Sequence, residues 1–421
     1  MHDDSFKQQH RLSPVAFTRK RSLDFPTLIL YLLNFRKHAN QTELDQFFSH
    51  LNAQKHATQV VTKSAFFQAR RQLSHSAFTD LNRQLVDCAY QSTWQPENWN
   101  GFRLCAIDGS SVRLPDEPQI SEHFGVHNGR SGQTPCAMGM ASVFYDVLNK
   151  VVIDSAIHPR LTSERQCAQD HLQFASQNDL VVFDRGYVSF WLYTYLLQSN
   201  IHFCMRAKTH QDLQVKQFVA SGKKEAIITI QPRPRSIETC QQKGLPTTPI
   251  RLRLIRVELP NEVEVLVTSL MDEQAYPADI FKALYHLRWG VEENYKRLKQ
   301  WLEIENFSGK SVLSVQQDFY AKIVAANLTA LMAIEAQDLI NKKTHNRQRK
   351  YQINYAQALT KMKHRIVALL TSQASALKRL IKQTITYFSQ TIEAVREGRR
   401  YPRKLKNIKN DIHFPAYKSA L

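Results

Sequence analysis

Apolar residues recur at helical spacing through the first quarter of the chain. The segment FPTLILYLLNF, residues 25–35, follows Asp24, a residue type that favours the N-cap, and carries Pro26 in its first turn. TELDQFFSHL and TKSAFFQARRQLSHSAFTDLNRQLVDCAY continue the helical pattern. We expect residues 1–20, which are polar, to be loosely ordered, and residues 1–95 to form a helical domain. Arg70 and Arg71 give it a basic face that would suit DNA, although surface arginines are common on helices.

From residue 100 the pattern changes to short apolar runs typical of strands. GFRLCAIDGSSVRL predicts a strand, CAMGMASVFYDVLNKVVIDSAIHP a hairpin, and TSERQCAQDHLQFASQ a helix. DLVVFDRG and IHFCMRA predict two more strands, with an amphipathic helix between them. This order of strands and helices indicates an α/β core with central parallel strands.

The next segment, residues 208–275, reads as mostly antiparallel sheet. KEAIITIQ, PIRLRLIRVEL and EVEVLVTSL are strand-like, and PRPRS and GLPTTP act as breakers. A helical pattern returns at Pro277. We therefore predict an α/β core formed by residues 100–207 and 276–335, a β-rich insertion at 208–275, and a basic helical region at 336–421.

The net charge of the chain indicates what kind of molecule it binds. The 421 residues carry 56 Lys and Arg against 37 Asp and Glu, a formal charge of +19 that favours a polyanion. Residues 341–421 hold 19 Lys and Arg against three acids, so they supply +16 of that charge. We expect the stretch GRRYPRKLKNIKN to lie as an extended arm on phosphates; the alternative is a solvated tail.

Cysteine and apolar content argue against two other classes of protein. The six cysteines form no CxxC pair, so neither a zinc site nor a disulfide framework is indicated. The longest apolar run, residues 28–35, is far shorter than a membrane span. We expect a cytoplasmic protein that does not bind a membrane.

Two predicted strands end in an aspartate with a glycine close behind it. Asp108 follows LCAI and precedes Gly109, and Asp184 follows LVVF and precedes Arg185 and Gly186. If the strands are parallel neighbours, the two carboxylates emerge together at the C-terminal edge of the sheet. Like charges held that close favour a hard divalent cation between them, although an Asp-Gly pair after a strand is usually only a turn.

The stretch YHLRWGVEENYKRLK offers a third carboxylate. On a helix, at about 100° per residue, five of its side chains fall on one stripe: Tyr285, Arg288, Glu292, Lys296 and Lys299. Glu293 lies about 100° away from Glu292. Glu292 could be paired with Arg288 and Lys296 in an ordinary charged helix, or it could bind a metal while the basic residues hold phosphates. Spacing alone leaves both interpretations open.

These residues resemble a known family. Asp108 in IDGS, Asp184 in FDRGY, and the order Y, two residues, R, three residues, E, six residues, K are similar to the insertion-sequence-4 family of bacterial DDE transposases. The similarity extends from FPTLILYLLNF to RRYPRK, nearly the whole chain. It implies a ribonuclease-H-like α/β catalytic core, interrupted between the second Asp and the Glu by the β-rich insertion.

The resemblance also implies a chemistry, cut-and-paste transposition. Asp108, Asp184 and Glu292 would bind two Mg²⁺ ions, for which Mn²⁺ can substitute. Arg288 and Lys299 would contact phosphates near the cleaved end, Tyr285 would help to place that end, and Lys296 and Arg185 would add to the DNA-binding patch. The partners would be double-stranded DNA, as terminal inverted repeats and as target, and a second subunit in a homodimeric synaptic complex.

One departure and two alternatives remain. Some relatives form a DNA hairpin with the help of an insertion tryptophan, but none of the five tryptophans here lies in residues 208–275, so Tyr276 or Phe281 would have to substitute. A metal-dependent DNA nuclease of the same fold, without strand transfer, is the first alternative. A domesticated, catalytically silent DNA-binding protein is the second.

Overall fold

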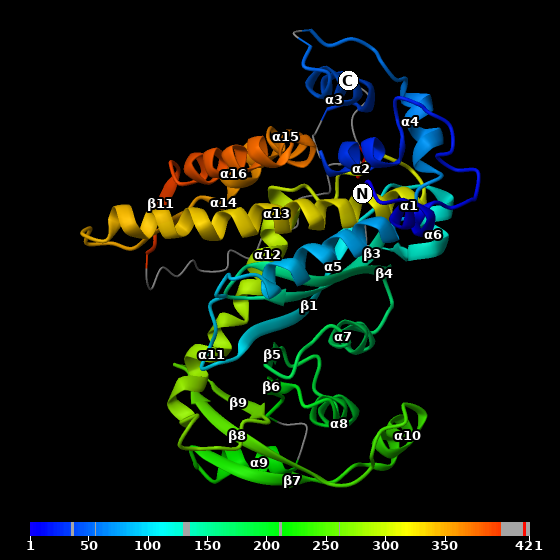
Figure 1. The fold of residues 1–421 in the computed structure, drawn as a ribbon. Coiled ribbons are helices and arrows are strands. Elements are labelled where there is room, and N and C mark those ends of the chain that lie inside the picture. Colours follow the sequence, from blue (N-terminus) through cyan, green and yellow to red (C-terminus); the bar gives the residue numbers. More distant parts are fainter. Residues whose placement is uncertain are drawn as a thin grey trace.

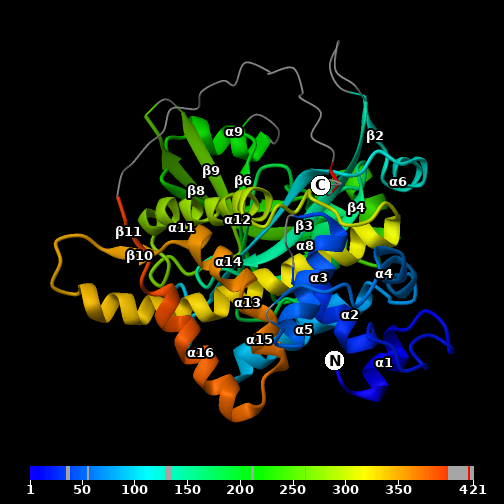
Figure 2. The ribbon, with the colours of Figure 1, turned by 90° about the horizontal axis from the view of Figure 1, so that it is seen from above.

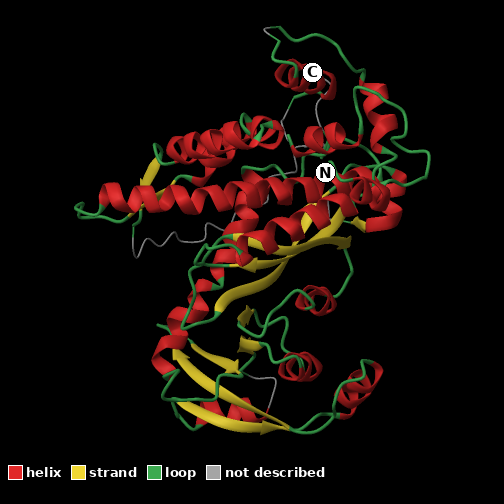
Figure 3. Ribbon diagram, in the orientation of Figure 1, coloured by secondary structure: helices red, strands yellow, loops and turns green. Residues whose placement is uncertain are grey.

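The computed structural model describes residues 1–34, 38–54, 56–128, 135–209, 213–260, 262–396 and 416–417. The chain folds around one nine-stranded mixed sheet, with most helices gathered at one end of the molecule and the last strands of the sheet at the other (Figures 1 and 3). The expected α/β class is therefore confirmed. The basic stretch GRRYPRKLKNIKN lies outside the described residues.

The sheet has the strand order β2, β3, β1, β5, β6, β9, β8, β7, with β4 on the other side of β3. Its strands are β1 (Arg103–Arg113), β2 (Val126–His127), β3 (Cys136–Asp146), β4 (Val151–Pro159), β5 (Asp179–Phe183), β6 (His202–Ala207), β7 (Glu225–Ile230), β8 (Ile250–Glu258) and β9 (Val263–Thr268).

Strands β1, β3 and β4 run antiparallel, whereas β1, β5 and β6 run parallel. The predicted hairpin and the predicted central parallel strands are both present. Every residue of β5 is buried, as expected of a parallel strand covered on both faces. Along β1, Leu104 and Ala106 pack into one hydrophobic core, and Cys105 and Ile107 pack into the other, because successive side chains point to opposite faces.

The predicted insertion is antiparallel, but it does not form a sheet of its own. Strand β9 pairs with β6, so β9, β8 and β7 extend the central sheet. Two further helices lie beside these strands, at the end of the molecule far from α13 (Figure 1). They are α9 (Leu213–Ala220) and α10 (Pro234–Gln242), and the sequence pattern did not predict them.

Helices cover both faces of the central strands. Helices α7 (Glu164–Leu172) and α8 (Phe190–Gln198) contribute to one core, and α11 (Phe281–Leu287), α12 (Trp289–Gln300) and α13 (Val312–Thr344) contribute to the other. Among the described helices, α13 alone is long and apolar enough to cross a membrane by length and composition. Its middle is buried against α5, β4 and α2, as in the core helix of a globular protein.

The N-terminal segment is helical, as predicted. Its elements are α1 (Asp4–His10), α2 (Phe25–Leu33), α3 (Asn40–Leu51), α4 (Lys63–Arg70) and α5 (Ser76–Gln91), and a further short helix, α6 (Pro118–Phe124), follows β1. Asp24 caps α2 by accepting a hydrogen bond from the Thr27 amide. Helix α1 corrects the expectation that residues 1–20 are loose, since Asp3 caps it. Helix α5 packs on β4 and α13, where Asn82 donates to the Val152 carbonyl and accepts from Asn327.

Of the two arginines predicted to give the N-terminal helices a basic face, Arg71 is exposed, but Arg70 is buried. Arg70 donates to Asp318 at 2.9 Å and to Gln317 and Ser308, which ties α4 to α13 and the loop before it. Arg70 is therefore a structural residue, unavailable to DNA.

The C-terminal helices α14 (Tyr355–Lys363), α15 (Ile366–Thr371) and α16 (Ala374–Phe388) lie along α13, seen from above in Figure 2. Strands β10 (Tyr351–Ile353) and β11 (Ile392–Ala394) form a separate antiparallel pair beside them. Near the chain end, the Ala416 carbonyl accepts a hydrogen bond from the Phe307 amide, so the terminus returns to the core.

Candidate active site

Two aspartates lie in register on neighbouring parallel strands, Asp184 directly after the end of β5 and Asp108 within β1, which continues to Arg113 beyond the strand end predicted at Asp108. The register of β1 and β5 pairs Arg103 with Asp179 and continues to Ala106 with Val182. Asp108 and Asp184 each follow two residues later, just beyond the point where β1 and β5 cease to pair. Asp184 turns the chain there, because its Oδ1 accepts a hydrogen bond from the Gly186 amide at 2.7 Å.

The surroundings of Asp108 disfavour its charged form. Burial is the largest influence on this carboxyl, and the nearby charges of Asp184 and Glu292 add to it, while the Gly109 amide and Arg288 oppose it. Together they raise the pKa of Asp108 to about 7. Asp184 and Glu292 therefore lie close enough to Asp108 to influence its ionisation.

Glu292 reaches this cluster from α12. The stretch predicted as one helix is divided at Arg288, which ends α11 and begins α12. Arg288 donates to Glu292 Oε1 at 2.8 Å, so the ion pair of the ordinary charged-helix interpretation is present. The pair nevertheless faces Asp108, whose pKa both residues affect.

Arg288 lies between two aromatic rings. Its guanidinium carbon is 5.7 Å from the centre of the Tyr285 ring and 5.4 Å from that of Trp289. Arg288 and Tyr285 are both only 8% exposed, whereas Trp289 is 41% exposed. Tyr285 thus packs against Arg288 on its buried side. Trp289 presents a partly exposed ring within one turn of Glu292.

The other predicted residues divide between the site and the solvent. Lys299 donates to the Ser111 carbonyl at 2.6 Å, which holds it against β1. Lys296 and Arg185 are exposed near the cluster. Glu293 is exposed and lies 3.9 Å from Arg297, away from the carboxylates, as expected from its angular position.

Tyr295 fixes α12 to the strand that carries Asp108. Its hydroxyl donates to the carbonyl oxygens of Asp108 and Ala141, both at 2.9 Å. At the start of the helix, a β-carbon at position 290 would lie 2.7 Å from Val147 Cγ1, so only glycine permits this approach to the β3–β4 hairpin. The sequence reading missed Tyr295, because its partners come from strands about 150 and 190 residues earlier.

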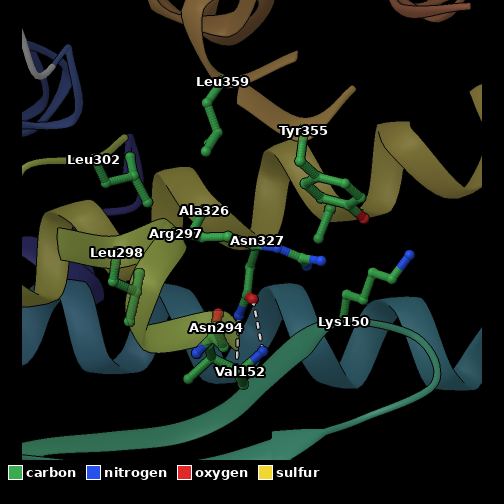
Figure 4. Close-up of a pocket in the computed structure, with 11 residues that line it drawn as sticks. Lys150, Val152, Asn294, Arg297, Leu298, Leu302, Ala326, Asn327, Tyr355 and Leu359 are labelled. Atoms are coloured by element: carbon green, nitrogen blue, oxygen red, sulfur yellow. Dashed lines mark hydrogen bonds between the residues drawn. The ribbon is translucent and has the colours of Figure 1, made fainter. Parts of the chain in front are cut away.

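The far side of α12 is anchored in the helical layer. Figure 4 shows Asn294, Arg297 and Leu298 facing Val152 of β4, Asn327 of α13 and Tyr355 of α14 around a small cavity. The Arg297 guanidinium lies over the Tyr355 ring at 4.4 Å, and Asn327 accepts from the Val152 amide at 2.8 Å. These contacts hold the helix that carries Glu292 in place.

A fourth acid, Glu164, stands beside the two aspartates. It is the first residue of α7, and its side chain is exposed to solvent as a whole. Partial burial of the carboxyl group, together with the charge of Asp184, raises its pKa. Below it, Tyr187 is fully buried, and its hydroxyl has no hydrogen-bond partner among the described residues. The sequence signal for Glu164 was its position in the first turn of the helix that precedes the Asp184 strand.

The donor set suits a hard divalent cation. Carboxylate oxygens are the ligands that Mg²⁺ and Mn²⁺ prefer, and a nearby cation would stabilise the ionised form of Asp108, which burial and the neighbouring acids disfavour. Within the described residues, no three His, Cys, Asp or Glu side chains are close enough to bind one ion as they stand. Glu292 is turned towards Arg288 instead.

The two residues suggested to replace an insertion tryptophan are not free to do so. Phe281 is completely buried in the core. Tyr276 is partly buried and stacks on Trp99, with ring centres 6.3 Å apart and an interplanar angle of 19°. Neither presents an open ring, so Trp289 is the accessible aromatic next to the carboxylates.

Comparison with known proteins gives the family. Residues 99–328 match the family described as Transposase DDE domain. The chain is 22% identical over 350 residues to the transposase InsG for insertion sequence element IS4 of Escherichia coli (strain K12), which covers 82% of this chain and 77% of InsG. A solved piggyBac transposase synaptic complex with hairpin DNA aligns with 91% of this chain and 80% of its own, at 10% identity and a TM-score of 0.44. The matched segment spans more than half of the chain and contains Asp108, Asp184 and Glu292, so the chain belongs to the DDE transposases, of the insertion-sequence-4 type that its motifs predicted.

Proposed function

We propose that this transposase binds the terminal inverted repeats of its insertion sequence, cleaves the DNA there and joins the 3′-hydroxyls to target DNA by a cut-and-paste route. The observation that carries the proposal is the register of β1 and β5, which brings Asp108 beside Asp184 with Glu292 facing them. Family membership makes this cluster the candidate for the chemistry.

The strand order supports the proposed domain division. Three antiparallel strands followed by two parallel ones agree with the ribonuclease-H-like core that the motifs imply. We assign residues 100–207 and 276–335 to this core, 208–275 to the insertion, 1–95 to an N-terminal DNA-binding unit and 336–421 to a basic C-terminal region. The insertion would shape the DNA path beside the carboxylates.

Asp108, Asp184 and Glu292 would hold two Mg²⁺ ions, with Mn²⁺ able to replace them. Bound divalent cations supply Lewis-acid stabilisation of the scissile phosphate and lower the pKa of the attacking water or 3′-hydroxyl. Because Asp108 has a pKa of about 7, its carboxyl must release a proton before it can act as a ligand. The hydrogen bond from Arg288 to Glu292 Oε1 restricts the position of the Glu292 side chain, which would have to turn from Arg288 towards the cation.

The basic and aromatic residues around the acids would hold the DNA end. Arg288, with a planar fork of donors, suits a phosphate next to the cut, and Lys299 suits a point-charge contact on the β1 side. Lys296 and Arg185 extend this surface. Tyr285 would act through Arg288, since it lies beneath the guanidinium, and Trp289 would stack on an exposed base or sugar.

The partner would be double-stranded DNA in the bacterial cytoplasm. The charge of +19, most of it in the last 81 residues, supports a large phosphate contact area. Two ends must be joined in one reaction, so we propose a homodimer in the synaptic complex.

A strand-transfer assay tests the proposal. Purified protein receives a pre-cleaved transposon end with a 3′-hydroxyl, a supercoiled target plasmid and Mg²⁺, with Asp184→Asn as the inactive control. We expect joined products from the wild type only. Cleavage of an uncut end without any joining would instead favour a metal-dependent nuclease, and binding without cleavage would favour a silent DNA-binding protein.

A further inference from the structure

The glycines behind the two aspartates leave room for a carboxylate from a third element. A β-carbon at position 109 would lie 3.3 Å from Oε1 of Glu164. A β-carbon at position 186 would lie 3.0 Å from Oδ1 of Asp184 and 3.7 Å from Oε2 of the same glutamate. The two oxygens of Glu164 therefore face the two glycines, Oε1 towards Gly109 in β1 and Oε2 towards Gly186 in the turn after β5.

Helix α7 is fastened in this position. Its second residue, Arg165, donates from Nε to the Gly186 carbonyl at 2.9 Å, which ties the start of the helix to the Asp184 turn. Gly109 and Gly186 are not in the left-handed region, so backbone conformation does not explain glycine at either place. At position 109 the Glu164 carboxylate takes up the space of a side chain, and at position 186 Asp184 Oδ1 does, with Glu164 Oε2 at ordinary contact distance.

A buried hydroxyl points to a ligand at the same place. Tyr187 is 0% exposed, its hydroxyl has no hydrogen-bond partner among the described residues, and Asp108, Glu164 and Asp184 all act on it electrostatically. An unpaired buried hydroxyl is unfavourable, and an acceptor brought in with a bound ion, such as a water molecule, would satisfy it.

We infer that Glu164 is a fourth carboxylate of the catalytic centre, binding a divalent cation directly or through water on the side of Asp184 opposite Glu292. This assignment rests on the proposed function of Asp108, Asp184 and Glu292. It gives the centre an acid that is not turned towards an arginine, unlike Glu292. Because Glu164 is exposed, an ion or its water can reach it from solvent.

Calorimetric titration of the full-length protein with Mn²⁺, in the presence of a transposon-end duplex, tests the assignment. The variant is Glu164→Gln, which keeps the shape and removes the charge. The matched control is Asp170→Asn, an exposed acid on the same helix that hydrogen-bonds Gln166. We expect Glu164→Gln to weaken Mn²⁺ binding by about tenfold and to raise the Mn²⁺ concentration needed for half-maximal cleavage by the same factor. Asp170→Asn should stay within about twofold of the wild type in both measurements.

A second variant approaches the carboxylate from the glycine side. Gly109→Ala places a methyl group against Glu164 Oε1 and should weaken Mn²⁺ binding in the wild-type background but not in a Glu164→Ala background. Mn²⁺ binding by Glu164→Gln equal to that of the wild type, or equal losses from Gly109→Ala in both backgrounds, would overturn the assignment alone. A wild-type protein that binds no Mn²⁺ would overturn the proposed catalytic centre as well.

Discussion

Asp108 and Asp184 occupy equivalent positions on two hydrogen-bonded parallel strands, each two residues beyond the last paired residues, Ala106 and Val182. Residues 76 positions apart in sequence are thus placed side by side by the sheet register. A one-residue slip of β5 would turn Asp184 to the opposite face. The geometry of the centre therefore depends on the packing that fixes this register.

The raised pKa of Asp108 makes its ionisation a cost to folding. In the unfolded chain the group titrates near pH 4, whereas in the folded protein its pKa is about 7, so the destabilisation grows through this window and is complete above it. Asp108→Asn removes the charge. In EDTA we expect the variant to be more stable than the wild type by roughly 1–3 kcal/mol at pH 8 and nearly equal to it at pH 4. Thermal unfolding followed by circular dichroism at both pH values measures this, and an increment independent of pH would contradict the assigned cause.

The adjacent glutamates provide a matched pair of substitutions. Glu292→Gln keeps an oxygen for Arg288 but removes the charge that would bind the cation, so cleavage should fall by about 100-fold or more while end binding is kept. Glu293→Gln should leave cleavage within about twofold, since this exposed residue faces Arg297. Cleavage of a labelled end duplex and its gel-shift affinity are compared for the two variants. Equal effects would show that Glu292 has no special part in the chemistry.

Tyr295 is expected to affect both stability and activity. Tyr295→Phe removes the hydroxyl that bonds the Asp108 and Ala141 carbonyls, at a cost of about 1–2 kcal/mol. The control is Tyr320→Phe, because the Tyr320 hydroxyl also bonds a backbone group, that of Ile157, away from the carboxylates. Urea unfolding should show similar losses for both variants. Only Tyr295→Phe should slow cleavage at saturating Mg²⁺, and an equal slowing by the control would reduce Tyr295 to a general packing residue.

Arg288 and Tyr285 should respond differently to conservative changes. Arg288→Lys keeps the charge but loses the planar fork and its stacking between two rings, so affinity for a pre-cleaved end should fall by about tenfold. Tyr285→Phe keeps the ring beneath position 288 and should bind almost as the wild type does. Fluorescence anisotropy with a labelled end measures both. A large loss for Tyr285→Phe would indicate that its hydroxyl contacts DNA itself.

Salt dependence tests the basic C-terminal region. Lys378 and Lys382 are exposed on α16, and each phosphate contact contributes about 0.9 to the slope of log K against log salt. Replacing both with Gln should reduce the slope by about 1–2. The double variant Lys216→Gln with Lys223→Gln, exposed residues of the insertion, is charge-matched and measures the contribution of the insertion to the slope separately. An unaltered slope for the α16 variant would remove this helix from the DNA path.

The features predicted well were those encoded within a few neighbouring residues. Alternation of pattern predicted the hairpin and the parallel strands, and the apolar run before Asp184 predicted β5. The predicted strand end at Asp108 was wrong, because pairing with β3 continues β1 to Arg113. Helix α10 was missed because PRPRS was read as a breaker, although Pro234 stands in the first turn, where proline is well tolerated. The supposed single helix divides at Arg288, which periodicity alone could not indicate.

The contacts that complete the site come from distant parts of the chain. Tyr295 bonds β1 and β3, and Glu164 contacts Gly109 and Gly186. These contacts form only in the assembled sheet, so the sequence pattern around either residue could not predict its role. For Arg70 the prediction assigned a surface role to a residue that the fold buries. It was counted as a surface charge because helical spacing places it beside Arg71, but the long helix α13 covers it and satisfies it with Asp318.

Because β9 pairs directly with β6, the strands between Asp184 and Glu292 form part of the same hydrogen-bonded framework as the aspartates themselves. A domain joined only by linkers could tilt independently of the core, but a sheet that is continuous from β5 to β7 resists such hinging. DNA held against the outer strands would therefore keep a fixed distance and angle to the cutting centre. The insertion, which separates Asp184 from Glu292 in the sequence, would therefore hold bound DNA at a fixed position relative to these acids.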